Sequence, residues 1–513
     1  MSNGSTCGDR PLLFQVNTRI FLQERGRDLR RRATLDDVPD ALFDDLAAKG
    51  FSWIWFLGVW TTGPAARAVS RSRTDWRAGF ARDLPDLTDE DITGSPFAIQ
   101  AYDVSSEYGG EAALARLRDR AARRGLRLLL DFVPNHVSPD HPWVKSHPEF
   151  FIEGTEADLA REPANWARPP GADGRVLALG RDPYFPGWPD TVQLNYLHAG
   201  LREAMVGELA RVAARCDGVR CDMAMLVLPD VFRRTWGERA IPRDGSAPVD
   251  RSFWPDAISR VRTARPGFLF MAEVYWDLEW TLQQQGFDFT YDKRLYDRLH
   301  GSDARAVREH LWAIPEFQER SARFLENHDE PRAATTFGTG DRHRAAAVVT
   351  FLVPGLRFFH EGQLDGRRVH VSMHLGRRPD EPADTGLRAF YERLLAVLRR
   401  EEVHSGAWRL SECKPAWDGN PTSDQFVVMA WEGTPGRLLV AVNYGPTQAQ
   451  CWARVPLGGL EGKVRLRDLL SDATYVRDGG ELRARGLYLD VPAWRHHVFA
   501  VEAAGPDDEA RKT

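Results

Sequence analysis

Long hydrophobic runs are absent from this 513-residue chain. No stretch approaches the roughly 18 apolar residues that a membrane-spanning helix needs, so we expect no membrane partner. The N-terminal segment MSNGSTCGDRPLLFQV also lacks a basic stretch followed by roughly 7–15 apolar residues, the pattern of a secretory signal. Cysteine is scarce, since only five occur and none belongs to a CxxC pair, which is typical of reduced packing residues. These absences together predict a cytoplasmic protein.

A large excess of one charge is absent as well. The 68 basic residues are balanced by 73 acidic ones, and the basic residues are spread along the chain. A partner such as nucleic acid would favour a basic cluster, so we expect no nucleic-acid binding. The hydrophobic content of 43% can bury a sizeable core, which excludes a disordered or fibrous chain.

Short apolar runs recur along the first four-fifths of the chain, and charge-rich helical stretches separate them. The stretches 111–125, 201–216 and 387–402 carry apolar residues at helical spacing. Such alternation predicts an α/β fold, specifically an eight-stranded (β/α)8 TIM barrel. The expected strands lie in the runs 12–18, 51–60, 126–133, 217–222, 267–274, 287–292, 323–327 and 356–361.

Two segments interrupt that alternation and predict additional domains. Residues 137–191 follow the third run and are rich in Pro, Gly, Trp and Asp, which indicates an excursion domain B over the barrel mouth. The catalytic barrel then comprises 10–136 and 192–402. Short alternating strands with turn residues between them predict a C-terminal antiparallel β-sandwich domain over 403–503, followed by a disordered tail, 504–513.

Three of the apolar runs deliver a carboxylate at or just past their ends: Asp222, Glu273 and Asp329. The carboxyl ends of barrel strands meet at the face where barrel enzymes hold their active sites. Cleavage of a glycosidic bond needs one carboxylic acid to protonate the leaving oxygen and one carboxylate beneath the sugar ring. Glu273 has the longer side chain and could reach the leaving oxygen. Each acid alone could be a helix cap or a surface charge, but their order and placement favour a shared catalytic site.

The residues flanking these acids also indicate a binding site. Arg220 lies two positions before Asp222 and therefore points to the same side of its strand, where it would stabilise the carboxylate. His136 and His328 each adjoin a polar residue just past a strand. We expect these histidines to line a site for sugar hydroxyls, although a purely structural role is the alternative.

Aromatic residues of the excursion are further candidates for sugar contact. Apolar sugar faces fit aromatic rings, and the chain contains 17 Trp, most of which must simply pack in the core. We expect one of four excursion residues to lie at a sugar subsite: Trp143, Trp166, Trp188 or Tyr184.

Four short motifs resemble those of glycoside hydrolase family 13, the α-amylase family. DFVPNH (131–136) resembles its first motif, GVRCD (218–222) its second, AEV within FMAEV its third, and ENHD (326–329) its fourth. The segment VQLNY (192–196) resembles the additional motif that precedes the second. The order and the strand positions agree with the family over roughly residues 10–500.

The resemblance implies a retaining α-glucosidic mechanism with a carbohydrate substrate. Asp222 would be the nucleophile that forms a covalent glycosyl-enzyme, Glu273 the acid/base, and Asp329 the group that holds the sugar hydroxyls. The subsite around the reacting sugar would be completed by His136, Arg220 and His328.

Several positions depart from the family pattern. Typical endo-acting α-amylases carry Lys-His three and four positions after the nucleophile, where this chain has Met225 and Leu226. In the segment 94–102, many members have a Tyr under the reacting ring and an Asp three residues earlier. Here Gly94 replaces the acid, while Phe97 retains an aromatic platform, and Tyr102 of the same segment is a further substrate-binding candidate.

These departures do not decide which molecule receives the sugar from the enzyme: water, a sugar hydroxyl or phosphate. Parts of 94–99, 138–151 and 272–292 resemble maltose-1-phosphate-using maltosyltransferases, which do not carry the Asn-His and His-Asp pairs of this chain. A hydrolase acting on α-linked glucosides or maltooligosaccharides is the main prediction, and a transglycosylase, maltosyltransferase or trehalose/maltose isomerase is the alternative. A catalytically inactive relative is disfavoured because all three acids are present.

No cofactor is expected to be required for this chemistry. Many family members bind a structural Ca²⁺ between the barrel and the excursion, using the Asn of the first motif. Asn135 occupies that position, and nearby acids are Asp140, Asp158, Asp173 and Asp182. Calcium needs six to eight oxygen ligands, and their convergence cannot be derived from spacing alone. No oligomeric state follows from the sequence.

Overall fold

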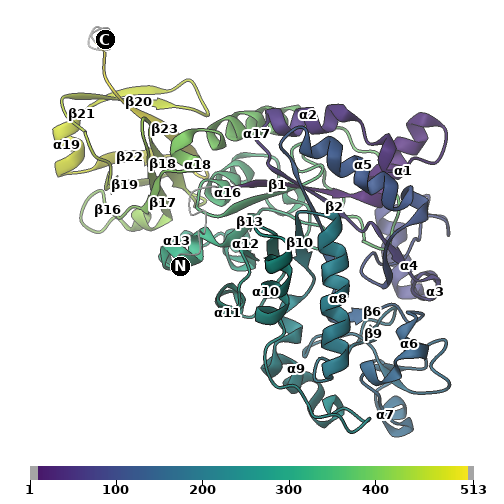
Figure 1. The fold of residues 1–513 in the computed structure, drawn as a ribbon. Helices are drawn as coiled ribbons and strands as arrows, with labels where there is room; N and C mark the ends of the chain where they lie inside the picture. The colour runs from purple at the N-terminus through teal and green to yellow at the C-terminus, as the bar shows by residue number, and fades with distance from the viewer. Residues whose placement is uncertain (1–9, 506–513) are drawn as a thin grey trace.

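The computed structural model describes residues 10–505 and contains a closed barrel of eight parallel strands (Figure 1). Seven of the eight strands fall within the predicted runs, and β13 overlaps the run 323–327 at its first two residues, which confirms the (β/α)8 barrel. The strands are β1 (Leu12–Asn17), β2 (Trp53–Leu57), β5 (Arg127–Phe132), β10 (Gly218–Cys221), β11 (Leu269–Ala272), β12 (Phe289–Tyr291), β13 (Ser321–Phe324) and β14 (Leu356–His360).

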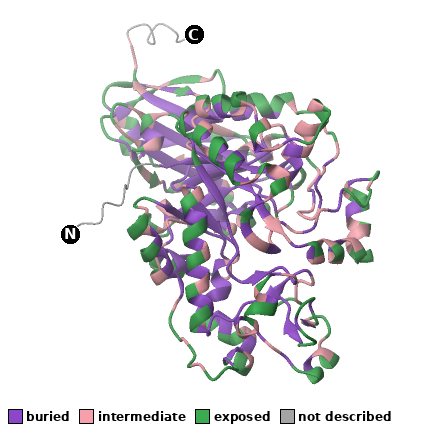
Figure 2. Ribbon diagram, turned by 45° about the vertical axis from the view of Figure 1, so that its right-hand side comes forward, coloured by how far each residue is buried: buried purple, intermediate pink, exposed green. Residues whose placement is uncertain are grey.

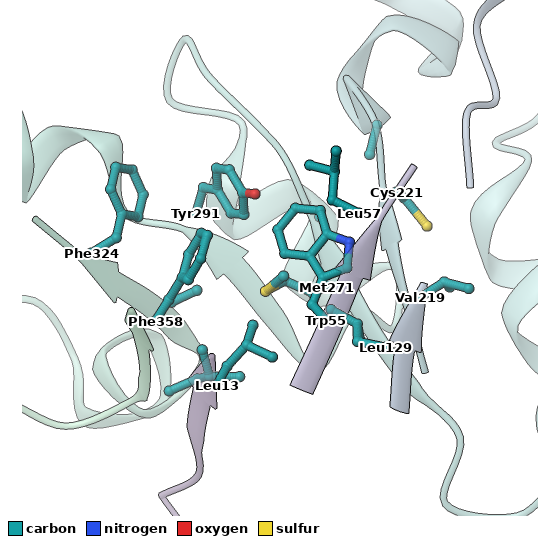
Figure 3. Packing of buried hydrophobic residues seen from close by; sticks show 14 of the residues in the cluster. Leu13, Trp55, Leu57, Leu129, Val219, Cys221, Met271, Tyr291, Phe324 and Phe358 are labelled. Carbon is teal, nitrogen blue, oxygen red and sulfur yellow. The ribbon is translucent and has the colours of Figure 1, made fainter. Parts of the chain in front are cut away.

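Nearly every residue of the barrel strands is buried, and most of these buried side chains are apolar. Figure 3 shows Leu13, Trp55, Leu129, Met271 and Phe358 within one packed cluster. Strand β10 fits between its neighbours because it begins with a glycine: a Cβ at residue 218 would lie 2.9 Å from the Cβ of Leu269. Such packing accounts for the apolar composition of the strand runs.

Helices surround the barrel and turn their exposed faces outward (Figure 2). The three predicted helices are present as α5 (Gly110–Ala122), α8 (Ala199–Arg215) and α17 (Thr385–Leu398). The other helices of this part are α1 (Thr18–Leu29), η1 (Leu35–Asp37), α2 (Asp40–Ala48), η4 (Ala224–Val227), α9 (Pro229–Trp236), η5 (Gly237–Ala240), α10 (Trp254–Ala264), α11 (Glu279–Gln284), α12 (Lys293–His300), α13 (Ala304–Leu311), α14 (Pro315–Glu319), α15 (Ala333–Thr336), α16 (Asp341–Phe351) and α18 (Glu401–His404).

Two insertions interrupt the alternation of strand and helix. The first was not predicted and follows β2; it contains β3 (Trp60–Thr62), α3 (Pro64–Ser72), α4 (Thr74–Asp83), β4 (Ile99–Val104) and η2 (Ser106–Tyr108). The second includes the predicted excursion after β5 and contains β6 (His136–Val137), α6 (Trp143–Ser146), η3 (Pro148–Phe150), α7 (Glu156–Arg161), β7 (Trp166–Ala167), β8 (Leu177–Ala178) and β9 (Val192–Gln193). Strands β6 and β9 pair antiparallel, so the two ends of the excursion lie side by side.

The C-terminal part is an antiparallel β domain, as predicted. A six-stranded sheet contains β15 (Ala407–Leu410), β17 (Phe426–Glu432), β18 (Arg437–Asn443), β23 (His496–Ala503), β20 (Lys463–Asp468) and β21 (Thr474–Asp478). A three-stranded sheet contains β16 (Cys413–Pro415), β19 (Ala449–Ala453) and β22 (Leu487–Val491), and the helices η6 (Pro421–Gln425) and α19 (Gly479–Ala484) connect strands of this domain. Phe426, Val428 and Leu439 belong to the separate apolar core of this domain.

The opposite face of the six-stranded sheet packs on the barrel. Val427, Met429 and Trp431 belong to the same apolar cluster as the barrel strands. The indole Nε1 of Trp431 donates a hydrogen bond to the carbonyl of Leu352 (2.9 Å). The predicted tail, 504–513, lies almost entirely outside the described residues. Among residues 10–505, no helix combines the length and the apolar character needed to cross a membrane.

Candidate active site

Three acidic side chains follow the carboxyl ends of barrel strands. Asp222 comes directly after β10 and Glu273 directly after β11, and both are nearly buried, with exposures of 5% and 4%. Asp329 follows β13 after a short segment, and 42% of its side chain is exposed. The structure therefore places all three predicted acids at the same rim of the barrel.

Arg220 joins the three acids. Its two terminal nitrogens donate separately, one to Oδ1 of Asp222 (2.5 Å) and the other to Oε2 of Glu273 (2.6 Å). Oδ2 of Asp329 lies 4.0 Å from the same guanidinium. Because one planar cation bridges both carboxylates, the two acids are held close together and in fixed orientations.

Glu273 has two further donors. The backbone N–H of Met223 donates to Oε2 (2.7 Å), and the hydroxyl of Tyr275 donates to Oε1 (2.8 Å). Met223 adopts a left-handed conformation with φ of 41°, which is uncommon for a residue other than glycine.

Burial raises the pKa of Glu273 above the usual range of a glutamate. The charges of Asp222 and Asp329 raise this pKa further, whereas the guanidinium of Arg220 opposes the change. An acid with a raised pKa can carry a proton near neutral pH, as a general acid must.

His328 lies beside Asp329, with its Nε2 3.1 Å from Oδ2 of the acid. Gln15, on β1, donates through its amide nitrogen to Nδ1 of His328 (2.9 Å), which leaves the proton of the neutral ring on Nε2. Burial lowers the pKa of His328 well below its usual value, so the ring is neutral. The ring can therefore offer an N–H to a sugar hydroxyl.

Phe97 contacts His328 and Arg220 directly, whereas His136 packs against a residue of the excursion. The ring of Phe97 lies 5.5 Å from that of His328, and the guanidinium of Arg220 lies 5.1 Å from the Phe97 centroid. His136 packs against Trp188 of the excursion at 5.1 Å. Burial lowers the pKa of His136 to about 4, and the charge of Asp222 partly offsets this change.

Tyr102 is not brought into this group. It is 3% exposed, its hydroxyl donates to the carbonyl of Val133 (3.1 Å), and the N–H of Val133 donates back to it (2.8 Å). Its ring packs on Trp60 and Phe132. Tyr102 thus acts as a core residue in this structure, and a direct sugar contact would require these bonds to break.

The four aromatic candidates of the excursion are distributed over different sites. Trp166 packs against Trp236, and Trp143 packs against Phe150, so both have structural neighbours. Trp188 contacts His136, whereas the 58%-exposed Tyr184 lies against Trp276, three residues after Glu273. Trp188 and Tyr184 therefore contact a predicted site residue and the loop after Glu273, respectively.

Several residues of the site were not identified from the sequence. Tyr275 and Gln15 hold Glu273 and His328, and Tyr291 is a fully buried residue at the end of β12 with its ring 5.9 Å from the Arg220 guanidinium. Asp131 accepts from the N–H of Gly58 (2.7 Å) and from the indole of Trp55 (3.2 Å), and burial raises its pKa to about 7. Gln15, Asp131 and Tyr291 could have been selected as site candidates because each carries a polar group within an apolar strand run.

The departures from the family pattern have structural explanations. Met225 and Leu226 lie in η4 and are buried, so neither side chain can bind a leaving chain. Gly94 adopts a φ of +84°, and a Cβ at this position would lie 3.0 Å from the backbone of Arg67. A glycine is therefore required at this turn, independently of any substrate contact.

The residues considered for calcium do not fit a calcium site. The side-chain amides of Asn135 and Gln193 pair reciprocally, at 3.1 and 2.9 Å, so the Asn135 oxygen accepts from an amide nitrogen. Asp158 forms ion pairs with Arg161 and Arg239. Within residues 10–505, no group of three or more His, Cys, Asp or Glu side chains is arranged to hold a metal ion.

The remaining acids of that set are engaged in hydrogen bonds or exposed to solvent. Asp140 accepts from the N–H of Ala65 (2.9 Å), Asp182 accepts from the N–H of Tyr184 (2.7 Å), and Asp173 is exposed. Calcium binding needs convergent, unengaged oxygens, which this set does not offer.

The fold and the site define a β/α-barrel protein with an acid pair bridged by arginine at its rim. The family model of the α-amylase catalytic domain matches residues 96–381, more than half of the chain. The chain therefore belongs to the α-amylase family, glycoside hydrolase family 13.

Individual relatives agree with this membership. The chain is 27% identical to the α-amylase MalA of Haloarcula japonica over 355 residues, which cover 67% of this chain and 46% of that protein. It is 30% identical over 157 residues to an α-1,4-glucan:maltose-1-phosphate maltosyltransferase of Pseudomonas aeruginosa, covering 29% of this chain and 22% of that protein. The chain spans about half the length of the first curated relatives it matches.

Solved structures support the fold. The maltogenic α-amylase AmyB of Thermotoga neapolitana superposes with a TM-score of 0.68 at 17% identity, over 96% of this chain and 99% of that one.

Proposed function

We propose that this protein is a retaining α-glucosidic hydrolase that acts on α-linked glucosides or maltooligosaccharides. The observation that carries the proposal is the bridge from Arg220 to both Asp222 and Glu273 at the barrel rim. Retaining glycosidases hold their two carboxyl groups about 5–5.5 Å apart, and a pair bound by one guanidinium is compatible with that separation.

The first step would form a covalent glycosyl-enzyme. The carboxylate of Asp222 attacks the anomeric carbon, the bond from that carbon to the leaving oxygen breaks, and Glu273 gives its proton to the leaving oxygen. The raised pKa of Glu273 supports the presence of that proton. Asp329, with His328 beside it, would bind hydroxyls of the sugar as its ring flattens.

The second step would release the sugar. Glu273, now a carboxylate, takes a proton from water while the water oxygen bonds to the anomeric carbon and the bond to Asp222 breaks. The donors Met223 N–H and Tyr275 OH favour the ionised form of Glu273, which suits its role as a base in this step.

Transfer to another acceptor is the second candidate. A transglycosylase, maltosyltransferase or isomerase would share the first step and replace water by a sugar hydroxyl or phosphate. The buried positions of Met225 and Leu226 weaken the case for an ordinary endo-acting α-amylase, because the usual contacts to a leaving chain are lost on that side. Similarity to a maltosyltransferase over 157 residues supports the transfer alternative.

A carbohydrate is therefore the proposed partner. We also propose that the protein is located in the cytoplasm. The described cysteines, Cys216, Cys221, Cys413 and Cys451, are free thiols, which agrees with a reducing compartment.

The proposal is tested by Asp222→Ala and Glu273→Gln. Chromatography of products from maltose, maltooligosaccharides and trehalose, with and without phosphate, separates hydrolysis from transfer. Each variant is expected to lose at least about 1000-fold in turnover while remaining folded. Asp103→Asn is the control, because Asp103 is an exposed acid paired with Arg211 on the surface. Substantial turnover by either site variant would refute the assignment.

A further inference from the structure

A pocket lined by residues of α1, β3 and α3 lies apart from the three acids. Figure 1 shows where α1 and α3 lie in the fold. The volume of the pocket is about 600 Å³, and none of the three acids Asp222, Glu273 and Asp329 lines it. Side chains from α1, the following loop and α3 bring five arginines to its wall: Arg19, Arg27, Arg31, Arg32 and Arg67.

Arg19 is a buried cation that has no acidic partner among residues 10–505. The residue is 8% exposed, and its guanidinium donates to the carbonyl of Gly94 and to the hydroxyl of Thr62 (3.1 Å). Across the described range 10–505, no carboxylate oxygen lies within 4.0 Å of it. A charge that is removed from water without a counter-ion is costly, so an anion in the adjoining pocket would stabilise it.

Arg67 stands on the same side of the pocket and is also free of carboxylates within the described chain. Its Nε donates to the carbonyl of Thr93 (3.2 Å), the residue before Gly94. The single turn at 93–94 therefore anchors both guanidiniums through backbone carbonyls. Since Gly94 approaches the Arg67 backbone closely, any larger residue would displace this arrangement.

Two of the three acids that line the pocket are paired with arginines other than Arg19 and Arg67. Asp91 accepts two hydrogen bonds from Arg377, each 2.8 Å, and these bonds lower its pKa to about 2. Glu107 pairs with Arg32 at 3.4 Å, and Glu90 is exposed to solvent. Arg19 and Arg67 therefore keep their charge available to a ligand.

We propose that this pocket binds the phosphate group of a small phosphorylated metabolite. Arginine guanidiniums match phosphate oxygens in geometry and charge, and two of them can share one phosphate. Hydroxyl groups of Thr61, Ser106 and Tyr108 line the remaining wall and can bind sugar or ribose hydroxyls. The pocket is large enough for such a unit beside the phosphate. This inference does not depend on the proposed glycosidase activity.

Calorimetry on the full chain tests the proposal with three separate ligands: inorganic phosphate, glucose 6-phosphate and AMP. We expect at least one to bind with millimolar or better affinity and to raise the melting temperature. Arg67→Gln and Arg19→Gln should each weaken that binding by about tenfold or more. Arg260→Gln is the matched control, because Arg260 is an exposed arginine that pairs with Glu203 outside the pocket.

Comparison of the three affinities shows whether the pocket recognises the phosphate alone or also the organic group attached to it. Equal affinity for all three would assign the recognition to phosphate alone, whereas a preference for one organic ligand would assign a role to the hydroxyl wall. The proposal is overturned if none of the three binds, if Arg67→Gln binds as tightly as the parent, or if chloride competes as well as phosphate. Should Arg19→Gln fail to fold, the half-buried Arg67 decides the outcome.

Discussion

Arg220 determines the geometry of the site at the scale of single residues. It is 1% exposed and is bonded to two carboxylates, so its charge and theirs compensate one another inside the barrel rim. A buried charged network is strongly destabilised when one member is removed, because the others remain buried without partners. The same residue therefore contributes to both stability and catalysis.

Replacement of Arg220 should affect both properties. We expect Arg220→Met to lower the free energy of unfolding by about 3–5 kcal/mol. Arg220→Lys should retain the charge but lose the simultaneous hydrogen bonds to Asp222 and Glu273. Turnover should therefore fall by about 100-fold or more. Denaturant titration and steady-state kinetics provide the two readouts, and a Lys variant with parental turnover would contradict the bridging role.

Tyr275 should set the basic limb of the pH profile. Bond cleavage requires protonated Glu273, so activity is present below the raised pKa of Glu273 and is lost as the pH rises through it. The Tyr275 hydroxyl stabilises the ionised carboxylate. Tyr275→Phe should therefore raise the Glu273 pKa and move the basic limb of kcat/KM to higher pH, by up to about one unit. An unchanged limb, or one that moves to lower pH, would contradict this role.

At the scale of elements, the excursion is attached to the barrel through an amide pair. The reciprocal bonds of Asn135 and Gln193 join the segment after β5 to strand β9, and Gln193 also donates to the carbonyl of Leu194 (3.0 Å). Both residues are buried, at 1% and 0% exposure. The amide pair thus contributes to the stability of the excursion.

This pair predicts a specific response to mutation and to chelators. Gln193→Ala should cost about 1–3 kcal/mol, because the buried Asn135 amide loses its partner. Gln448→Ala, which removes an exposed amide in the C-terminal domain, should change stability by less than about 0.5 kcal/mol. The parental melting temperature should be the same in EDTA and in calcium chloride; a clear fall in EDTA would indicate a metal site.

The elements also show which parts could be predicted from the sequence. The eight barrel strands were identified because nearly all of their residues are buried and their runs are largely apolar. The insertion after β2 was missed because its helices α3 and α4 are short and carry few buried residues. Asp222 and Glu273 were identified as candidates by residue type at strand ends. Gln15 and Gln193 were missed as partners because their contacts, to His328 and Asn135, join segments far apart in the chain.

At the scale of the whole molecule, the C-terminal domain and the barrel share one apolar cluster. Trp431 is fully buried at this contact, and the guanidinium of Arg10 lies 4.6 Å from its ring. Tyr444 donates from its hydroxyl to the carbonyl of Leu299 (2.6 Å), which adds a polar contact between the domains. We therefore expect the barrel and this domain to unfold together.

Trp431→Ala tests that coupling. The cavity should lower the free energy of unfolding by about 3–5 kcal/mol. Trp417→Ala is the matched control in the same domain, because Trp417 is 57% exposed and should cost less than about 0.5 kcal/mol. Calorimetric unfolding should show one transition in the parent. Two separate transitions in the parent, or equal effects of the two substitutions, would contradict the coupling.

Asp222 is the residue that we propose forms the covalent bond to the sugar. Brief incubation with 5-fluoro-α-glucosyl and 5-fluoro-α-maltosyl fluorides, whose intermediates break down slowly, followed by peptide mass spectrometry, tests this role most directly. We expect a glycosyl adduct on the peptide that contains Asp222, and no adduct in Asp222→Ala. Turnover of the fluoride without any adduct on Asp222, or with an adduct on another carboxylate, would contradict this role.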